Sequence, residues 1–248
     1  MRGAIFHKPD SRDLAVEVRK FLRSNGFNVR ISNRRLEGYD FIVVIGGDGT
    51  ILRVLQMLRE CPPIFAINTG RIGLLTHCEP KDYKENLLRS LKEFDVEEFI
   101  RLKCGDELTA LNEIAILCSA PAKLVEMKIY VDDVLIDVLR CDGVLISTPI
   151  GSTAYALSIG GPIVDTYLSS ILIVPVAPFK LGWRPWVVRD DRVIRVEFDR
   201  SVFVVADGQK TLKFNPGEVT VEKYEHPARF FKFEKRIEKI VKRLKEIK

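Results

Sequence analysis

The chain reads Phe41-Ile42-Val43-Val44-Ile45-Gly46-Gly47-Asp48-Gly49-Thr50. Its five apolar residues form a continuous run, which is typical of a strand buried on both faces of a sheet. The glycines that follow allow a tight turn, and a helical pattern runs from residue 50 to residue 58. Because amides at a helix N-terminus carry partial positive charge, this order of elements predicts a site for an anion.

The same alternation of strands and helices extends through the first 95 residues. The pattern predicts strands at residues 3–6, 29–31, 41–45 and 64–67, and helices at residues 11–24, 50–58 and 80–94. Strands that alternate with amphipathic helices are typical of a parallel sheet covered by helices. We therefore predict an α/β domain over residues 1–95 that carries the glycine turn.

A different pattern begins at residue 96, with many short strands and few helices. We predict strands at residues 108–117, 125–130, 135–139, 143–147, 171–174, 186–188, 193–198, 202–205 and 218–222. Asp132-Asp133 and Asp207-Gly208 are turn signals between them. The second domain, residues 96–230, is thus predicted to be all-β and sandwich-like. Residues 231–248 are predicted to form a helix that packs back on the N-terminal domain.

Composition limits the classes of function. The net charge of +5 and the pI of about 8.9 suit a protein that handles phosphorylated ligands, but no Lys/Arg block resembles a nucleic-acid-binding arm. The N-terminus does not resemble a signal peptide, and the most apolar stretch, residues 171–179, is too short to cross a bilayer. We expect neither nucleic acid nor membrane as a partner.

The cysteines and histidines give no metal pattern. Five cysteines, at positions 61, 78, 104, 118 and 141, are scattered without a C-x-x-C pair, as expected for reduced thiols in a cytoplasmic protein. His77 stands beside Cys78, but no second ligand pair follows. We therefore predict no metal site built by the protein alone.

Asp48 is unusual because its charge would repel a phosphate bound at the turn. One interpretation is a functional role, in which the carboxylate accepts a proton from an attacking hydroxyl or holds Mg²⁺ through water. The other is structural, with Asp48 as the N-cap of the helix. The residues alone leave both interpretations open.

A second motif spans residues 142–162 and reads Asp-Gly-Val-Leu-Ile-Ser-Thr-Pro-Ile-Gly-Ser-Thr-Ala-Tyr-Ala-Leu-Ser-Ile-Gly-Gly-Pro. Gly151, Gly160 and Gly161 allow the backbone to approach a flat or charged ligand. Tyr155 offers an aromatic face to a nucleotide ring, and Ser158 offers a hydroxyl. So many ligand-type groups in a short stretch favour a binding site over a plain turn-rich loop.

Together these motifs resemble those of the NAD kinase family (ATP/polyphosphate-NAD kinases), in an archaeal-like form. The segments 68–73, 111–113 and 206–209 agree with the family in the same order, so the resemblance covers essentially the whole chain. Diacylglycerol and sphingosine kinases and phosphofructokinases share the glycine turn, but the lipid kinases lack this form of the second motif. A lipid or sugar kinase with only the turn in common, and a non-catalytic NAD(P)-binding sensor, are the alternatives.

The resemblance implies a reaction. ATP, or another donor such as polyphosphate, would phosphorylate the 2′-hydroxyl of the adenosine ribose of NAD to give NADP, with Mg²⁺ or another divalent cation accompanying the donor. Asp48 would be the general base or the group that orients the hydroxyl. The all-β domain would bind the dinucleotide, and members of the family are commonly homodimers or homotetramers.

The family's site residues map onto this chain by position. Phosphate and ATP contacts would come from Gly46, Gly47, Gly49, Thr50, Arg53, Asn68 and Arg71. NAD contacts would come from Asp48, Gly49, Asn112, Glu113, Lys123, Arg140, Asp142, Ile150, Thr153, Ala154, Tyr155, Ser158, Ala177 and Gln209. Within this set the family's Glu bonds ribose hydroxyls, its Asn meets adenine, and Asp142 resembles the acid at the nicotinamide end. Lys123 and Arg140 are equally well read as exposed charges on strands.

Two positions depart from the common bacterial pattern. Ile150 replaces the usual Thr, so that only packing or a backbone contact is available there. Phe179 stands where many members carry His after Pro, which removes a histidine contact. Trp183 and Trp186 follow nearby and would alter the pocket wall or an oligomer interface. These changes affect ligand details rather than the implied reaction.

Overall fold

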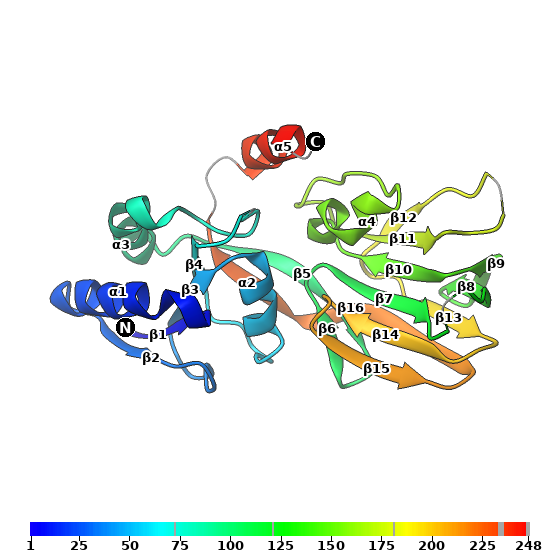
Figure 1. Ribbon diagram of the computed structural model, residues 1–248, viewed down its shortest axis with the longest axis horizontal. Helices are drawn as coiled ribbons and strands as arrows, with labels where there is room; N and C mark the ends of the chain where they lie inside the picture. The colour runs from blue at the N-terminus through cyan, green and yellow to red at the C-terminus, as the bar shows by residue number, and fades with distance from the viewer. Residues whose placement is uncertain (72, 121, 181, 233–235, 247–248) are drawn as a thin grey trace. The chain divides into compact units, whose positions relative to one another are not determined.

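The computed structural model describes residues 1–71, 73–120, 122–180, 182–232 and 236–246 (Figure 1). The chain divides into two compact units, Met1–Glu98 with Pro227–Lys248 as unit 1, and Phe99–His226 as unit 2. It passes into unit 2 within strand β5 (Val96–Cys104) and returns within strand β16 (Gly217–Phe231). Of the predicted C-terminal helix, residues 233–235 and 247–248 lie outside the described residues, and α5 spans Arg236–Glu246.

Unit 1 contains a parallel sheet in the order β2-β1-β3-β4. Its strands are β1 (Arg2–His7), β2 (Asn28–Ile31), β3 (Phe41–Gly46) and β4 (Ile64–Asn68). The end of β16 adds to this sheet in parallel, with Phe230 opposite Ile64. Because the strands are parallel, their carboxyl ends share one edge, where Gly46 lies opposite Asn68.

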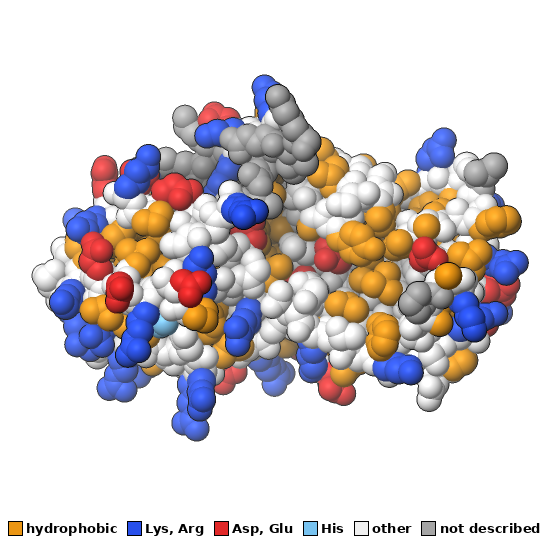
Figure 2. Space-filling view, in the orientation of Figure 1, with side chains coloured by type: hydrophobic (Ala, Val, Ile, Leu, Met, Phe, Trp, Pro, Cys, Tyr) orange, Lys and Arg blue, Asp and Glu red, His pale blue; other side chains and the backbone are white. Residues whose placement is uncertain are grey.

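Helices cover this sheet as the apolar spacing predicts. The long helices are α1 (Arg12–Ser24) and α3 (Tyr83–Glu93), preceded by the short 3₁₀ helices η1 (Pro9–Ser11) and η2 (Pro80–Asp82). Val18 of α1 and Leu87 of α3 pack in one apolar cluster with Val43 of β3. Helix α2 (Asp48–Leu55) follows β3 directly and buries Ile51. The face over α1 and β2 is rich in Lys and Arg side chains (Figure 2).

Unit 2 is a β-sandwich, which confirms the predicted α/β plus all-β fold class. One sheet runs β12-β11-β10-β7-β14-β15, and the other contains β16-β13-β8-β9, with β5 pairing β16 and β6. The pairs β10–β11, β10–β7, β11–β12, β13–β16, β13–β8, β14–β15, β14–β7, β5–β6 and β8–β9 are antiparallel. Apolar side chains of both sheets form one cluster that includes Ile116, Ile146, Met127 and Val196.

The strands of unit 2 have the following bounds. They are β6 (Leu108–Ala110), β7 (Glu113–Cys118), β8 (Val125–Val131), β9 (Val134–Cys141), β10 (Gly143–Ser147), β11 (Ser170–Val176), β12 (Trp186–Arg189), β13 (Ile194–Phe198), β14 (Val202–Ala206) and β15 (Lys210–Phe214). The helices η3 (Ile150–Thr153) and α4 (Tyr155–Ser158) follow β10. Ala156 of α4 packs with Leu145 and Leu172 of the six-stranded sheet.

Five details of the predicted elements were wrong. The single strand over residues 108–117 is two strands, β6 and β7, interrupted at Leu111-Asn112. The predicted strand 218–222 is only part of the fifteen-residue β16, and β5 and β15 were missed because charged residues interrupt their apolar pattern. Helix α2 ends at Leu55, since Met57 donates to Val54 (3.0 Å) in a tighter turn.

No helix in the described part of the chain has the length and apolar character needed to cross a bilayer.

Candidate active site

The glycine turn joins β3 to α2 with little room for side chains. Gly47 is the N-cap of α2, and Asp48 is its first helical residue. A Cβ on Gly46 would lie 2.2 Å from Oγ1 of Thr50, and a Cβ on Gly70 would lie 3.1 Å from Cα of Gly47. The amides of Asp48 and Gly49 precede the first bond of α2, from the amide of Thr50 to the carbonyl of Gly47 (2.9 Å), so the turn presents donors to an anion.

Asp48 does not cap its own helix, so the structural interpretation of this residue as an N-cap is wrong. Instead its carboxylate accepts two backbone hydrogen bonds from a neighbouring loop. The amide of Leu74 donates to Oδ2 at 2.9 Å, and the amide of Leu75 donates to Oδ1 at 2.8 Å. A carboxylate oxygen has more than one lone-pair site, so each oxygen can still accept a hydrogen bond from a ligand hydroxyl.

The loop that holds Asp48 follows β4 at the same edge of the sheet. Asn68 is buried, and its Nδ2 donates to Oε1 of Glu79 (2.9 Å) while its Oδ1 accepts the amide of Gly70 (3.0 Å). The predicted phosphate contact Asn68 therefore uses its side chain to shape the loop. Arg53 and Arg71, two other predicted phosphate contacts, are exposed on α2 and on the loop.

In unit 2, Asn112 and Glu113 lie where β6 and β7 are interrupted. The buried carboxylate of Asp207 accepts the amides of Leu111 (2.8 Å), Asn112 (2.7 Å) and Glu113 (3.2 Å). This explains the interruption, because three consecutive amides bond a side chain in place of a neighbouring strand. In the sequence Asp207 is a turn signal within the family-like segment 206–209, and neither feature indicates that it bonds this backbone.

The segment after β10 holds Asn112 from another side. Thr148 donates from its amide to the carbonyl of Asn112 (2.8 Å) and from Oγ1 to the carbonyl of Leu111 (2.6 Å). A Cβ on Gly151 would lie 2.1 Å from the carbonyl oxygen of Asn112. The two predicted dinucleotide-binding segments, 111–113 and 142–162, are thus bonded to each other.

Burial changes the acidity of the two carboxyl groups here. It raises the pKa of Glu113 to about 8, and the charge of Asp207 adds to this effect. Burial also raises the pKa of Asp207 to about 6, although its three backbone donors oppose the rise. Because Asp207 has these donors, we assign the negative charge to Asp207 and the proton to Glu113 at neutral pH. Oε2 of Glu113 is buried and has no partner within the described residues.

The other predicted dinucleotide contacts surround this segment or lie on exposed turns. Ile150 is buried, and its carbonyl accepts Oγ1 of Thr153 at 3.2 Å, so its side chain packs as expected. Ala154 is half-buried, whereas Tyr155 and Ser158 of α4 are exposed. Lys123, Arg140, Asp142, Ala177 and Gln209 are also exposed.

Backbone hydrogen bonds hold Arg140 and Asp142 beside the segment that contains Ala177. The amide of Phe179 donates to the carbonyl of Arg140 (2.8 Å), and the amide of Asp142 donates to the carbonyl of Val176 (3.0 Å). Both bonds place the end of β9 beside Ala177, which has a φ of 45°. Phe179 itself is exposed.

Three contributors to the site were missed from the sequence. They are Asp207, Thr148 and the backbone amides of Leu74 and Leu75. Asp207 and Thr148 were visible only as members of family-like segments, and backbone donors leave no signal in side-chain chemistry. Within the described residues, no group of three or more His, Cys, Asp or Glu side chains is arranged to hold a metal ion.

Comparison with known families matches both units. The ATP-NAD kinase N-terminal domain matches residues 28–94, and the ATP-NAD kinase C-terminal domain matches residues 111–233. An NAD kinase of Archaeoglobus fulgidus is 46% identical over 252 residues, which cover 100% of both chains. An NAD kinase of Pyrococcus furiosus is 36% identical over 255 residues, which cover 93% of this chain and 92% of the relative.

Two solved structures have the same fold. The crystal structure of an NAD kinase from Archaeoglobus fulgidus in complex with ATP matches with a TM-score of 0.94 and 45% identity, covering 100% of both chains. The structure of yeast NADH kinase complexed with NADH matches with a TM-score of 0.87 and 24% identity, covering 100% of this chain and 87% of the yeast chain.

Proposed function

This chain belongs to the ATP-NAD kinase family, and from that premise we propose that it transfers the terminal phosphoryl group of ATP to the 2′-hydroxyl of the adenosine ribose of NAD, giving NADP. The family match in unit 2 includes the segment 142–162, which the lipid kinases lack in this form. That match favours NAD over a lipid or sugar as the acceptor. The carboxylate at position 48 favours an enzyme over a sensor that only binds the dinucleotide.

The observation that carries the proposal is the arrangement of Asp48. Two backbone amides fix its carboxylate next to the glycine turn, at the N-terminus of α2. A fixed carboxylate accepts the hydrogen of the attacking hydroxyl as general base or as orienting group. The helix amides bind the transferred phosphoryl group, and catalysis comes mainly from positioning and from charge stabilisation.

Unit 2 supplies the recognition of the dinucleotide. Asn112 and Glu113 project from a backbone that Asp207 and Thr148 hold on two sides. A protonated Glu113 both donates and accepts hydrogen bonds, as a ribose diol requires, and adds no charge that repels the pyrophosphate. Asn112 offers the donor and the acceptor of an amide to the adenine edge.

Mg²⁺ enters this proposal as part of the donor Mg·ATP. The only acid of the glycine turn, Asp48, already accepts two amides, and Mg²⁺ in such sites is bound largely by substrate phosphates and water. The ion would neutralise charge on the phosphates. We expect EDTA in excess of total metal to abolish NADP formation, and added Mg²⁺ to restore it. Full turnover in EDTA would contradict this part of the proposal.

The test of the proposed function is a direct assay. We expect the protein to convert NAD to NADP with Mg·ATP, read by an NADP-specific fluorescent coupling reaction. Asp48→Asn should lower kcat by about 10²-fold or more while NAD still binds. Asp13→Asn, which alters an exposed acid on α1, is the matched control. Tight NAD binding without NADP formation would favour the sensor, and phosphorylation of a lipid or sugar instead would favour the other kinase.

Donor, location and assembly complete the proposal. The same assay with polyphosphate in place of ATP tests the alternative donor. The five cysteines are free thiols, which suits a cytoplasmic enzyme.

We also propose a homodimer or homotetramer, because β9 is the last strand in its sheet and exposes Val134 (65%), Leu135 (48%) and Val138 (42%). An exposed apolar edge strand of this kind favours association.

A further inference from the structure

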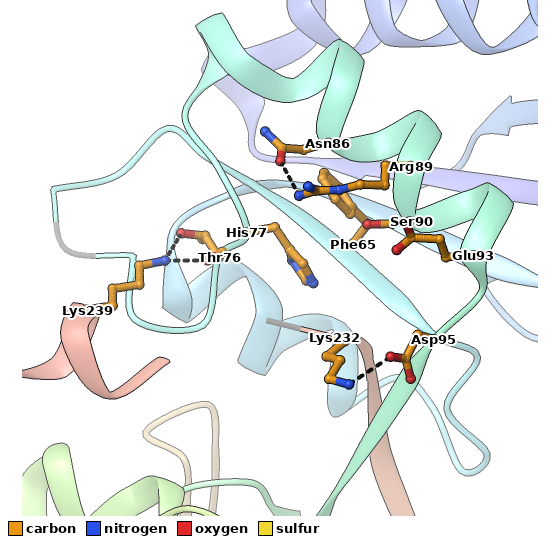
Figure 3. Close-up of a pocket in the computed structure, with 10 residues that line it drawn as sticks. All are labelled: Phe65, Thr76, His77, Asn86, Arg89, Ser90, Glu93, Asp95, Lys232 and Lys239. Carbon is orange, nitrogen blue, oxygen red and sulfur yellow. Dashed lines mark hydrogen bonds and ion pairs between the residues drawn. The ribbon is translucent and has the colours of Figure 1, made fainter. Parts of the chain in front are cut away.

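Helix α5 contacts the loop that holds Asp48. The ammonium group of Lys239 donates a hydrogen bond to the carbonyl oxygen of Thr76 and lies 3.3 Å from Oγ1 of the same residue (Figure 3). No family-like motif includes α5, and none of the predicted site residues lies in it. Lys239 is separated from the loop by more than 160 positions in the sequence, so the contact is purely a product of the fold.

Thr76 closes the turn whose amides bind Asp48. Its side chain is 1% exposed, and its Oγ1 donates to the carbonyl of Gly73 at 2.8 Å. Gly73 has a φ of 67°, and a Cβ there would lie 2.6 Å from Oγ1 of Thr76. Residues 73–76 therefore form one tight hydrogen-bonded turn, and a displacement of Thr76 moves the amides of Leu74 and Leu75 with it.

The residue after this turn is fixed separately. His77 accepts the amide of Ala66 at Nδ1 (2.9 Å), so its Nε2 carries the proton and donates to the carbonyl of Phe231 (2.9 Å). Its ring also stacks on Phe65 with centroids 4.5 Å apart. The turn 73–76 thus has a fixed neighbour on its C-terminal side, so we expect a shift at Thr76 to affect Leu74 and Leu75 more than His77.

A cavity adjoins the contact. It has a volume of about 250 Å³ and is lined by Thr76, His77 and Lys239 together with residues of α3 such as Asn86 and Ser90 (Figure 3). Close-packed side chains therefore do not hold Thr76 from that direction. A hydrogen bond from a charged donor is stronger than one between neutral groups, so Lys239 is well suited to restrain the turn across this gap.

We infer that Lys239 is a positioning residue for Asp48: through Thr76, α5 sets the direction of the two amides that orient the carboxylate. The inference rests on the proposed function, because it assigns α5 a part in placing the group that meets the acceptor hydroxyl. Misplacing a catalytic group by about 1 Å can cost about 10²-fold in rate without loss of substrate binding.

The kinetic test compares three substitutions in α5. Lys239→Met removes the charge and the donor but keeps the length of the side chain, and should lower kcat about tenfold or more. The KM values for NAD and ATP should stay within about twofold, because binding groups are untouched. Lys239→Arg should restore most of kcat. Lys242→Met, at an exposed position of the same helix, should leave the kinetics unchanged.

A second measurement does not depend on turnover. Amide hydrogen exchange of the segment 69–79 should be faster in Lys239→Met than in the wild type and in Lys242→Met, while exchange in β3 stays the same. Absence of NADP formation by the wild type would overturn the proposed function, whereas the exchange experiment still tests the contact. Unchanged exchange, or unchanged kcat in Lys239→Met, would overturn the inference. Should that variant fail to fold, Lys239→Gln is judged by the same two measurements.

Discussion

Asp207 shows how a buried side chain can hold the backbone that carries two proposed substrate contacts. It bonds the amides of Leu111, Asn112 and Glu113 with one carboxylate. We expect Asp207→Ala to raise the KM for NAD at least tenfold and to lower the free energy of unfolding by about 3 kcal/mol or more, because buried amides lose their acceptor. Steady-state kinetics and urea denaturation measure the two effects.

Asp133→Ala is the control for this prediction. Asp133 also lies in a turn of unit 2, but its side chain is 95% exposed and is only 3.8 Å from one nitrogen of Arg195. Exposed ion pairs contribute little, so this variant should keep the wild-type KM. Its free energy of unfolding should fall by no more than about 1 kcal/mol, because Ala is less favoured than Asp at the φ of 67° found there. Equal effects of the two substitutions would show that Asp207 acts only as an ordinary turn residue.

Glu113 predicts a dependence of stability on pH. Its pKa is raised from 4.5 to about 8 in the folded protein, so between these values the folded state binds more protons than the unfolded state. The free energy of unfolding therefore falls as pH rises through this window, by up to about 1.4 kcal/mol per pH unit. Asp207 contributes in the same direction only up to about pH 6.

Substitution of Glu113 separates its contribution to the pH dependence of stability from that of Asp207. Glu113→Gln should flatten the decline between pH 6 and pH 8, measured by denaturant unfolding at several pH values. Glu126→Gln changes an exposed acid of β8 and should keep the decline. A decline of the same steepness in Glu113→Gln would mean that Glu113 is ionised in the folded protein at neutral pH.

At the scale of elements, the strand, turn and helix over residues 41–55 were predictable because their signals are local. The apolar run and the glycines act on their neighbours in sequence. The break between β6 and β7 was not predictable from its own residues, because apolar residues typical of strands stand on both sides of it. Its cause, Asp207, lies 96 positions from Leu111. Similarly, the sequence identified Asp48 as the acid of the turn, but it did not identify the backbone amides that bond its carboxylate.

The glycine turn gives a prediction of its own at this scale. Gly46→Ala would place a Cβ 2.2 Å from Oγ1 of Thr50, so β3 and α2 cannot keep their present junction. We expect kcat to fall at least tenfold and the free energy of unfolding to fall by about 1–3 kcal/mol. Gly49→Ala meets no atom within 4 Å and is the stability control. Wild-type kcat in Gly46→Ala would show that the junction adapts freely.

For the whole molecule, the family resemblance indicated two functional halves, and the fold places the predicted residues in two separately cored units. Unit 1 carries the glycine turn with Asp48, and unit 2 carries Asn112 and Glu113 with the segment 142–162. The spacing of apolar residues predicted both architectures, because helices and strands bury apolar residues at different spacings along the chain. What they missed is α5 as a neighbour of the Asp48 loop, because a contact between distant segments leaves no local pattern.

Assembly is the prediction that belongs to this scale. If β9 lies in the proposed interface, Leu135→Lys with Val138→Lys should reduce the mass in solution to that of one chain, as measured by light scattering. Phe203→Lys, at an apolar position of β14 that is 37% exposed, is the control and should leave the mass unchanged. An unchanged mass in the double variant would exclude β9 as the interface.

Residues 99–226 are inserted between the two parts of unit 1, and Phe231 belongs to the apolar cluster of that unit. A ribosome therefore makes all of residues 99–226 before it makes the end of β16, from Pro227 to Phe231, which completes the sheet that was begun first. Nascent chains will pass through a stage in which residues 99–226 have been made and the sheet of unit 1 still lacks the end of β16. Synthesis from the N-terminus thus leaves the unit that carries Asp48, although begun first, to be completed last.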